Sequence, residues 1–133
     1  MELWKNGPQF EQSEHFRLGT DSVLLADFVN IGARRRGIDL GCGSGILPLL
    51  LLTRSTALHM TGLELNPEAA RVARENIEAS GAENIVCGTS DLLRDVDRTG
   101  GRFDVIAANL VADIILRMAP DVGDCLTDEG VLI

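Results

Sequence analysis

Three glycines at alternate positions, Gly41, Gly43 and Gly45, separate a short apolar run from a longer apolar segment. Because glycine tolerates positive φ and has no Cβ, such a turn lets a bound molecule lie directly against the backbone. Asp39 stands two residues before the first of these glycines. A carboxylate there repels a pyrophosphate but attracts an ammonium or sulfonium group. Residues 37–52 therefore predict a strand, a tight turn and a helix that hold a cationic ligand, although such a turn can also be purely structural.

A second acidic side chain ends the next predicted strand, residues 58–64. Glu64 follows Asp39 by 25 residues. An acid at this place in a βαβ unit can accept hydrogen bonds from both ribose hydroxyls of an adenosine. The glycine spacing differs from the dinucleotide fingerprint G-x-G-x-x-G, because Ile46 occupies the place of its third glycine. An NAD-type nucleotide-binding domain is therefore disfavoured.

The pattern D-x-G-x-G-x-G, which runs from Asp39 to Gly45, resembles motif I of the class I S-adenosylmethionine (SAM) dependent methyltransferases. In that family the glycine loop wraps the methionine end of the cofactor, so the resemblance implies SAM as the cofactor. The residues expected to bind SAM follow strand ends, form the glycine loop or begin the first helix. They are Thr20, Asp21, Asp39, Gly41, Cys42, Gly43, Gly45, Glu64, Leu65, Asp91, Leu92 and Asn109.

Residues 16–30 resemble the segment that opens several RNA-base methyltransferases, notably the bacterial tRNA adenine exocyclic-amine methyltransferases. There the segment closes over the cofactor, which implies a position for Thr20 and Asp21 near its methionine end. The same residues also fit an ordinary amphipathic helix that Thr20 or Asp21 caps. The apolar residues expected on its buried face are Val23, Leu24, Ala26, Phe28 and Val29.

Asn109 follows the predicted fourth strand, residues 103–108, at the place where the family holds its methyl acceptor. The resemblance thus implies that Asn109 is the catalytic residue that orients the acceptor amine. Adenine-modifying enzymes carry Asn-Pro-Pro-aromatic there, whereas this chain has Asn109-Leu110-Val111-Ala112. Residues 103–120 and 127–133 resemble the ribosomal protein methyltransferases instead.

These two resemblances imply a SAM-dependent methyltransferase that acts on a nitrogen of a macromolecule, either an RNA base or a ribosomal protein. Methyl transfer needs in-line positioning more than a strong base, so proximity supplies much of the catalysis. A catalytically inactive SAM-binding module or subunit is the alternative, because the prolines and the aromatic residue after Asn109 are missing.

The remaining patterns predict the elements that position these residues. Asn66-Pro67 begins a helix that Gly81 ends, residues 84–88 form a third strand, and residues 131–133 form a fifth. Asp91 follows the third strand, where the family often binds the adenine amino group, although Asp91 can also cap a helix. We expect an α/β, doubly wound, mainly parallel Rossmann-like sheet with strand order 3-2-1-4-5 and its ligand at the carboxyl ends.

Composition indicates a single domain over residues 1–133, in which residues 1–15 form an irregular arm. The longest apolar run, residues 46–52, is far shorter than the ~18 to 20 residues of a membrane span, and no signal peptide is recognisable. We therefore expect a cytoplasmic protein without a membrane partner.

The three cysteines are widely spaced and form no metal-binding pattern, which predicts reduced thiols and no metal. A net charge of -8 opposes binding to DNA or RNA without a local basic patch, and Arg34-Arg35-Arg36 is the only dense one.

Family members usually continue beyond the fifth strand with two more strands, which are missing here. The apolar edge of residues 131–133 is then uncovered and liable to pair with another chain. We therefore expect a homodimer through this edge, with coverage by residues 1–15 or fraying of the strand as alternatives.

Overall fold

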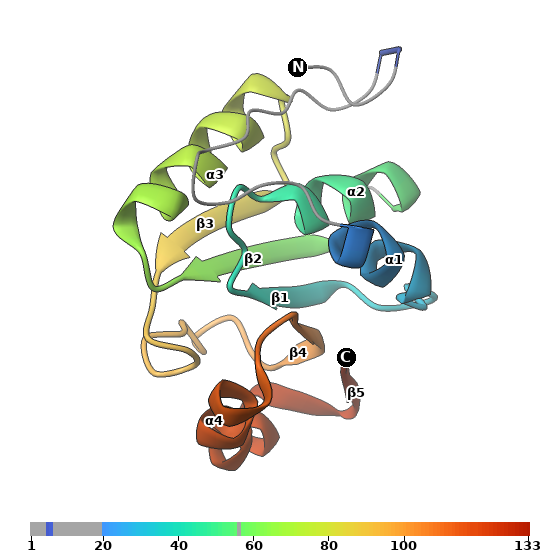
Figure 1. Cartoon of the computed structure of the whole chain (residues 1–133). Coiled ribbons are helices and arrows are strands. Elements are labelled where there is room, and N and C mark those ends of the chain that lie inside the picture. The colour runs from blue at the N-terminus through green and yellow to red at the C-terminus, as the bar shows by residue number, and fades with distance from the viewer. Residues whose placement is uncertain (1–4, 7–19, 56) are drawn as a thin grey trace.

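The computed structural model describes residues 5–6, 20–55 and 57–133 (Figure 1). The predicted arm, residues 1–15, falls outside these ranges except for residues 5 and 6. The strands in the described ranges are β1 (Arg36–Leu40), β2 (His59–Glu64), β3 (Ile85–Thr89), β4 (Phe103–Ala108) and β5 (Leu126–Leu132). The helices there are α1 (Thr20–Phe28), α2 (Ile46–Arg54), α3 (Pro67–Ala79) and α4 (Ala112–Cys125). None of these helices has the length and apolar character that a bilayer span requires.

Neighbouring strands of the sheet all pair in parallel, in the order β3-β2-β1-β4-β5. This confirms the predicted α/β fold and its strand order. Helix α2 connects β1 to β2, α3 connects β2 to β3, and α4 connects β4 to β5. In Figure 1, α1, α2 and α3 lie on one side of the sheet and α4 lies on the other. That residues 1–133 form a single domain stays a prediction.

Two apolar clusters cover the two faces of the sheet, because successive residues of a strand point to opposite sides. Ile38 of β1 and Ile106 of β4 pack in one cluster with Met118 of α4. Val105, the neighbour of Ile106, packs in the other cluster with Leu51 of α2. The inner strands β1, β2 and β4 are therefore mostly buried on both faces, which leaves the carboxyl edge of the sheet as the place for polar site residues.

Strand β5 begins earlier than the sequence predicted. Its expected start was Val131, after a turn, whereas the strand runs from Leu126 directly after α4. Phe103 pairs with Leu126 and Val105 pairs with Val131, so two positions along β4 correspond to five along β5. A bulge therefore takes up the residues expected in the turn, and β5 forms one edge of the sheet.

Helix α1 buries a narrower face than predicted. Ala26 and Val29 are buried as expected, but the predictions for Val23, Leu24 and Phe28 are wrong, since these residues are 45%, 61% and 73% exposed. Apolar residues occur on more than one side of this helix, so its sequence does not single out one buried face. Packing against α2 buries Ala26 of the helix and Val29, the residue that follows it, and leaves the other side of α1 open.

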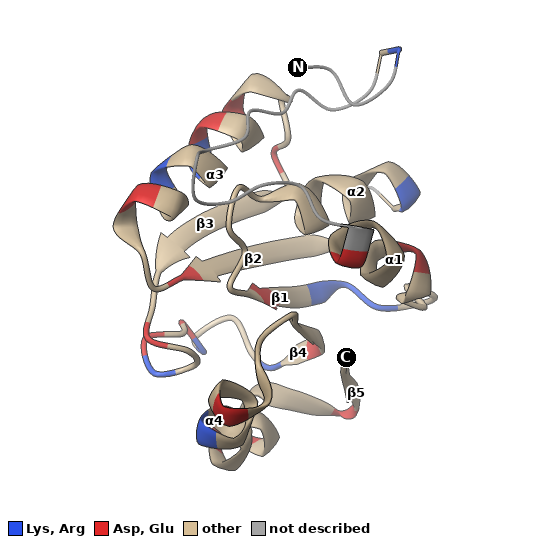
Figure 2. Cartoon of the chain, viewed as in Figure 1, with Lys and Arg blue, Asp and Glu red and all other residues tan. Residues whose placement is uncertain are grey.

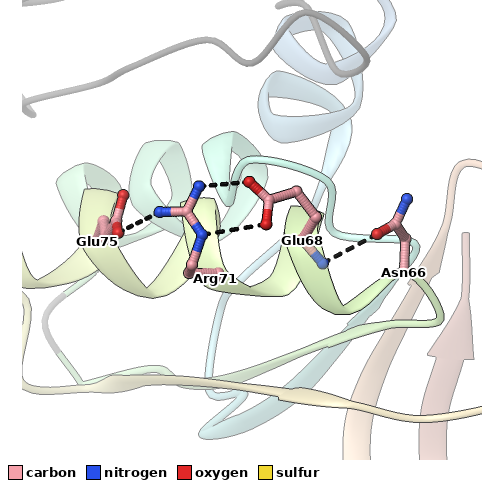
Figure 3. Close-up of polar contacts among 4 residues, drawn as sticks. All are labelled: Asn66, Glu68, Arg71 and Glu75. Atoms are coloured by element: carbon pink, nitrogen blue, oxygen red, sulfur yellow. Dashed lines mark hydrogen bonds and ion pairs between the residues drawn. The ribbon is translucent and has the colours of Figure 1, made fainter.

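Helix α3 begins and ends where the sequence predicted. The side chain of Asn66 accepts a hydrogen bond from the Glu68 N–H at 2.9 Å, and Pro67 occupies the first turn. On the outer side of the helix, Arg71 bridges Glu68 and Glu75 (Figure 3). These ion pairs are exposed, so solvent screens them. The Asn66 cap, rather than the ion pairs, determines that α3 starts directly after β2.

Candidate functional site

The glycine turn is held in place by the backbone of β2. Gly41, Gly43 and Gly45 have φ angles of 67°, 53° and 82°, in the left-handed region that favours glycine. The N–H groups of Gly41 and Cys42 donate to the Leu63 carbonyl at 2.8 and 3.3 Å. The predicted strand, turn and helix are thus present, and the turn is attached to the end of β2.

Glu64, the last residue of β2, joins the glycine turn to the start of α3. Its carboxylate accepts hydrogen bonds from the N–H of Gly43 at 3.3 Å and from the N–H of Asn66 at 3.4 Å. The residue is 8% exposed. An ionised carboxylate has about four acceptor positions, so these two bonds orient the group without saturating it. Glu64 can therefore still accept hydrogen bonds from the hydroxyl groups of a ligand.

The sequence predicted Asp39 at the end of its strand. In the structure Asp39 is the last residue but one of β1, which ends at Leu40. Its sheet neighbours are Gly62 of β2 and Ala107 of β4, so small residues flank the carboxyl group. Burial raises the pKa of Asp39 well above its ordinary value, and negative charge on Cys87 and Glu64 raises it further. A cationic group beside the carboxyl would offset this cost of ionisation. A buried acid at this position therefore fits an ammonium or sulfonium ligand.

A cavity of about 200 Å³, the strand-end cavity, opens where the carboxyl ends of β1, β2 and β3 meet. Predicted cofactor residues that line it are Gly41, Glu64, Leu65, Asp91 and Leu92. Lining residues that the sequence did not single out are Leu40, Leu63, Ser90, Leu110, Ile114 and Arg117. Ile114 and Arg117 are three residues apart on α4, so helical spacing was the signal that could have found them. Apolar walls with a few charged groups suit a flat base joined to a ribose.

The turn after β3 is held by Ser90. Its Oγ donates to the Leu92 carbonyl at 2.7 Å and accepts from the Asp95 N–H at 3.3 Å. Leu92 has a φ of 55°, which is uncommon for a residue other than glycine. The carboxylate of Asp91 pairs with Arg94 at 3.2 Å, and turns rather than a helix follow it, so Asp91 is not a helix cap. The role of Asp91 at the adenine amino group stays a prediction.

A wider cavity of about 560 Å³, the α1 cavity, is lined by residues of α1 and of the end of β4. Asp21 and Asn109, both predicted site residues, line it together with Asp27 and Phe28. The next residue, Leu110, lines the strand-end cavity instead. Asn109 therefore stands at the boundary between the two cavities.

Predicted site residues that line neither cavity are Asp39, Cys42, Gly43 and Gly45. Gly43 acts on the strand-end cavity through its bond to Glu64. The sulfur of Cys42 lies 3.4 Å from that of Cys87 in β3. The side chain of Thr20 lies outside the described structure, so its role stays a prediction.

Acidic residues gather at this edge of the sheet. Figure 2 shows them in red at the ends of β1 and β2 and on α1. Asp21 and Asp27 line the α1 cavity, and Glu64 and Asp91 line the strand-end cavity. The α1 cavity therefore favours cationic over anionic groups, whereas Arg117 lines the strand-end cavity beside its two acids.

Comparison with known proteins supports both sequence resemblances. The Ribosomal protein L11 methyltransferase of Caldanaerobacter subterraneus subsp. tengcongensis is 39% identical over 110 residues, which cover 83% of this chain and 34% of that protein. A tRNA1(Val) (adenine(37)-N6)-methyltransferase of Escherichia coli O1:K1 / APEC is 38% identical over 95 residues, which cover 70% of this chain and 39% of that protein. The chain thus spans about a third of the length of the curated relatives it matches.

A solved structure and a family model agree with these relatives. The crystal structure of a ribosomal protein L11 methylase from Lactobacillus delbrueckii subsp. bulgaricus matches with a TM-score of 0.69 and 28% identity, over 84% of this chain and 55% of that one. The family model described as Ribosomal protein L11 methyltransferase (PrmA) matches residues 24–133, a range that includes the glycine turn, Glu64 and Asn109. The chain therefore belongs to the ribosomal protein L11 methyltransferase (PrmA) family.

Proposed function

We propose that this chain is the cofactor-binding and catalytic core of a SAM-dependent methyltransferase that acts on a nitrogen of a macromolecule. The observation that carries the proposal is the bond from the Gly43 N–H to Glu64 at 3.3 Å. It couples the glycine turn to the acid that ends β2, so that both face one ligand as a rigid unit. A turn that only connects a strand to a helix needs no such partner.

The residues present fit the chemical groups of SAM. Glu64 would accept hydrogen bonds from the ribose hydroxyls, and Asp91 would accept from the adenine amino group. Asp39 and the glycine turn would hold the methionine end, where an ammonium group would favour the ionised carboxyl. When bound there, SAM supplies a methyl group that its sulfonium makes electrophilic.

The α1 cavity is the inferred place of the methyl acceptor. Because Asn109 stands between the two cavities, its side-chain carbonyl can accept a hydrogen bond from the acceptor N–H and orient the nitrogen lone pair. Asp21 and Asp27 favour an acceptor that arrives as a cation, such as a lysine side chain of a ribosomal protein. That cation has to lose a proton before it attacks, since only the neutral amine has a free lone pair.

An RNA base is the second candidate acceptor, and Phe28 favours it. The residue is 73% exposed and lines the α1 cavity, where a base could stack on its ring. The net charge of -8, however, opposes an RNA backbone. We therefore favour a ribosomal protein over RNA as the methyl acceptor.

A two-step assay tests this function. Calorimetry with S-adenosylhomocysteine measures the cofactor site, and transfer of a radiolabelled methyl group to ribosomal proteins or to total RNA identifies the acceptor. We expect binding, and label in protein. Binding without transfer to either acceptor would favour the inactive SAM-binding module. Stabilisation by NAD and not by SAM in a thermal-shift assay would contradict the proposal.

We further infer that the protein acts in the cytoplasm, where these acceptors are found, and that it self-associates through β5. Leu132 of this edge strand is 40% exposed, and an edge strand offers unpaired backbone groups. Sedimentation should show association that rises with protein concentration and that Leu132→Lys weakens. A protein that stays monomeric at high concentration in both forms would contradict the homodimer.

A further inference from the structure

Two thiols meet at the glycine turn, and the function proposed above gives neither sulfur atom a chemical role. Cys42 lies in the turn and Cys87 lies in β3, and their sulfur atoms are 3.4 Å apart. A Cβ at Gly62 of β2 would lie 3.1 Å from the Cys42 sulfur and 3.5 Å from the Cys87 sulfur. The missing side chain of Gly62 therefore provides the space in which the two sulfur atoms approach each other.

We propose that Cys42 and Cys87 form a reversible disulfide that controls the cofactor turn. A disulfide bond is about 2.05 Å long, so the sulfur atoms have to approach by roughly 1.4 Å. Both residues are attached to β2, Cys87 by its pairing with Gly62 and Cys42 by its N–H bond to the Leu63 carbonyl. The effect on cofactor binding rests on the proposed function, whereas formation of the disulfide does not.

Cys87 is the thiol that an oxidant reaches first. It lines a surface cavity of about 340 Å³ together with Arg74 and Glu78, whereas Cys42 is only 5% exposed. A hydrogen bond joins the two thiols and lowers the pKa of Cys87, and the positive charge of Arg74 also lowers it. The same hydrogen bond, together with burial, raises the pKa of Cys42. Cys87 is therefore the nucleophile and Cys42 keeps its proton.

Hydrogen peroxide is an oxidant that this arrangement can use. The Cys87 thiolate attacks one peroxide oxygen and becomes a sulfenic acid, while the O–O bond breaks and the other oxygen leaves as hydroxide, which takes up a proton to give water. The Cys42 sulfur then attacks the Cys87 sulfur, and the sulfenic oxygen leaves as a second water with the Cys42 proton. Two thiols and one peroxide thus give one disulfide and two waters. An external thiol reverses the step by exchange.

Movement of Cys42 acts directly on the bonds that hold the turn. The preceding Gly41 donates its N–H to Leu63 at 2.8 Å, and the following Gly43 donates its N–H to Glu64 at 3.3 Å. A pull on Cys42 toward β3 shifts both N–H groups and so disturbs the orientation of the acid at the ribose. We expect the disulfide to weaken binding of S-adenosylhomocysteine by about tenfold or more.

Tryptic mapping tests the pair without any cofactor. After treatment with hydrogen peroxide, the peptide of residues 37–54 should be linked to the peptide of residues 75–94, with a loss of about 2 Da for the two hydrogens. The peptide of residues 118–133, which contains Cys125, should stay unlinked, and dithiothreitol should restore the separate peptides. A link to Cys125, or a sulfinic acid on Cys87 without a link to Cys42, would overturn the proposal.

Calorimetry with S-adenosylhomocysteine then tests the control of binding. The Cys87→Ser protein should bind equally well before and after peroxide, whereas the Cys125→Ala protein should lose affinity as the unaltered chain does. If the disulfide-linked protein binds S-adenosylhomocysteine as tightly as the reduced protein, the disulfide does not regulate cofactor binding. A reduced protein that does not bind at all would refute both the proposed function and this regulation, while the peptide map would still decide whether the disulfide forms.

Discussion

The two cavities at the carboxyl edge of the sheet are built in different ways. The strand-end cavity is bounded by backbone held in place by hydrogen bonds: the Gly43 N–H to Glu64, and Ser90 across the turn after β3. The α1 cavity is wider and is lined by exposed side chains, among them Phe28. A preorganised site lowers the cost of binding a small cofactor, whereas an open site can accept part of a macromolecule. The contrast suits a protein with one constant ligand and one large one.

Gly43→Val is expected to have the largest effect on cofactor binding, because it disrupts the preorganised glycine turn beside the strand-end cavity. The φ of 53° at Gly43 is a conformation that a β-branched residue rarely adopts. We expect calorimetry to show a loss of S-adenosylhomocysteine affinity of about 100-fold or more. Gly88→Ala is the matched control, since a Cβ there meets no atom within 4 Å. Normal affinity in a folded Gly43→Val protein would remove the basis for the site.

Glu64→Gln should have the next largest effect, because the amide accepts weaker hydrogen bonds than the carboxylate. We expect binding of S-adenosylhomocysteine to weaken by about 1.5 to 3 kcal/mol while the fold survives. Glu75→Gln, on the exposed face of α3, is the control and should leave the affinity unchanged. If calorimetry shows the same affinity for Glu64→Gln, Glu64 only holds the turn and does not bind ribose.

Asp39 should make the stability of the folded protein depend on pH. Burial first, and negative charge on Cys87 and Glu64 second, raise its pKa in the folded protein. The folded protein thus holds this proton more tightly than the unfolded chain does, so the stability that Asp39 contributes is complete below its ordinary pKa of 3.8 and is lost as the pH rises through the raised pKa.

Asp39→Asn should therefore be more stable than the unaltered protein at neutral pH and should bind S-adenosylhomocysteine more weakly. Urea unfolding between about pH 4 and pH 8 measures the first effect, and calorimetry measures the second. The same pH dependence of unfolding in both proteins would show that Asp39 does not titrate as its burial implies.

Phe28→Ala should have the smallest effect on the fold, because Phe28 lines the open α1 cavity. Its 73% exposure predicts a change in the free energy of unfolding within about 0.5 kcal/mol and an unchanged cofactor affinity. Methyl transfer should nevertheless fall, because Phe28 lines the cavity proposed for the methyl acceptor. Leu51→Ala in α2 is the contrasting truncation, since Leu51 is fully buried and its loss should cost about 2 to 5 kcal/mol. A large loss of stability in Phe28→Ala would show that α1 is packed on both sides.

Much of the cofactor side could be predicted because its signals are local. Strand β4 spans residues 103–108 as predicted, and the Asn66 cap with Pro67 determines the start of α3. Glycine at three alternate positions was sufficient for the turn, since φ preference belongs to the residue itself. Parallel crossovers then place the ends of β1 and β2 at one edge, and that brings the turn to Glu64.

Only the tertiary structure decided the contacts between residues that are distant in sequence. The buried side of α1 depends on α2, and the left-handed conformation of Leu92 depends on the hydrogen bonds of Ser90. Cys42 and Cys87 meet because parallel pairing sets Cys87 opposite Gly62, where no side chain keeps the two sulfur atoms apart. Composition and spacing determine which elements form, but the register of hydrogen bonds between strands determines which side chains of those elements touch.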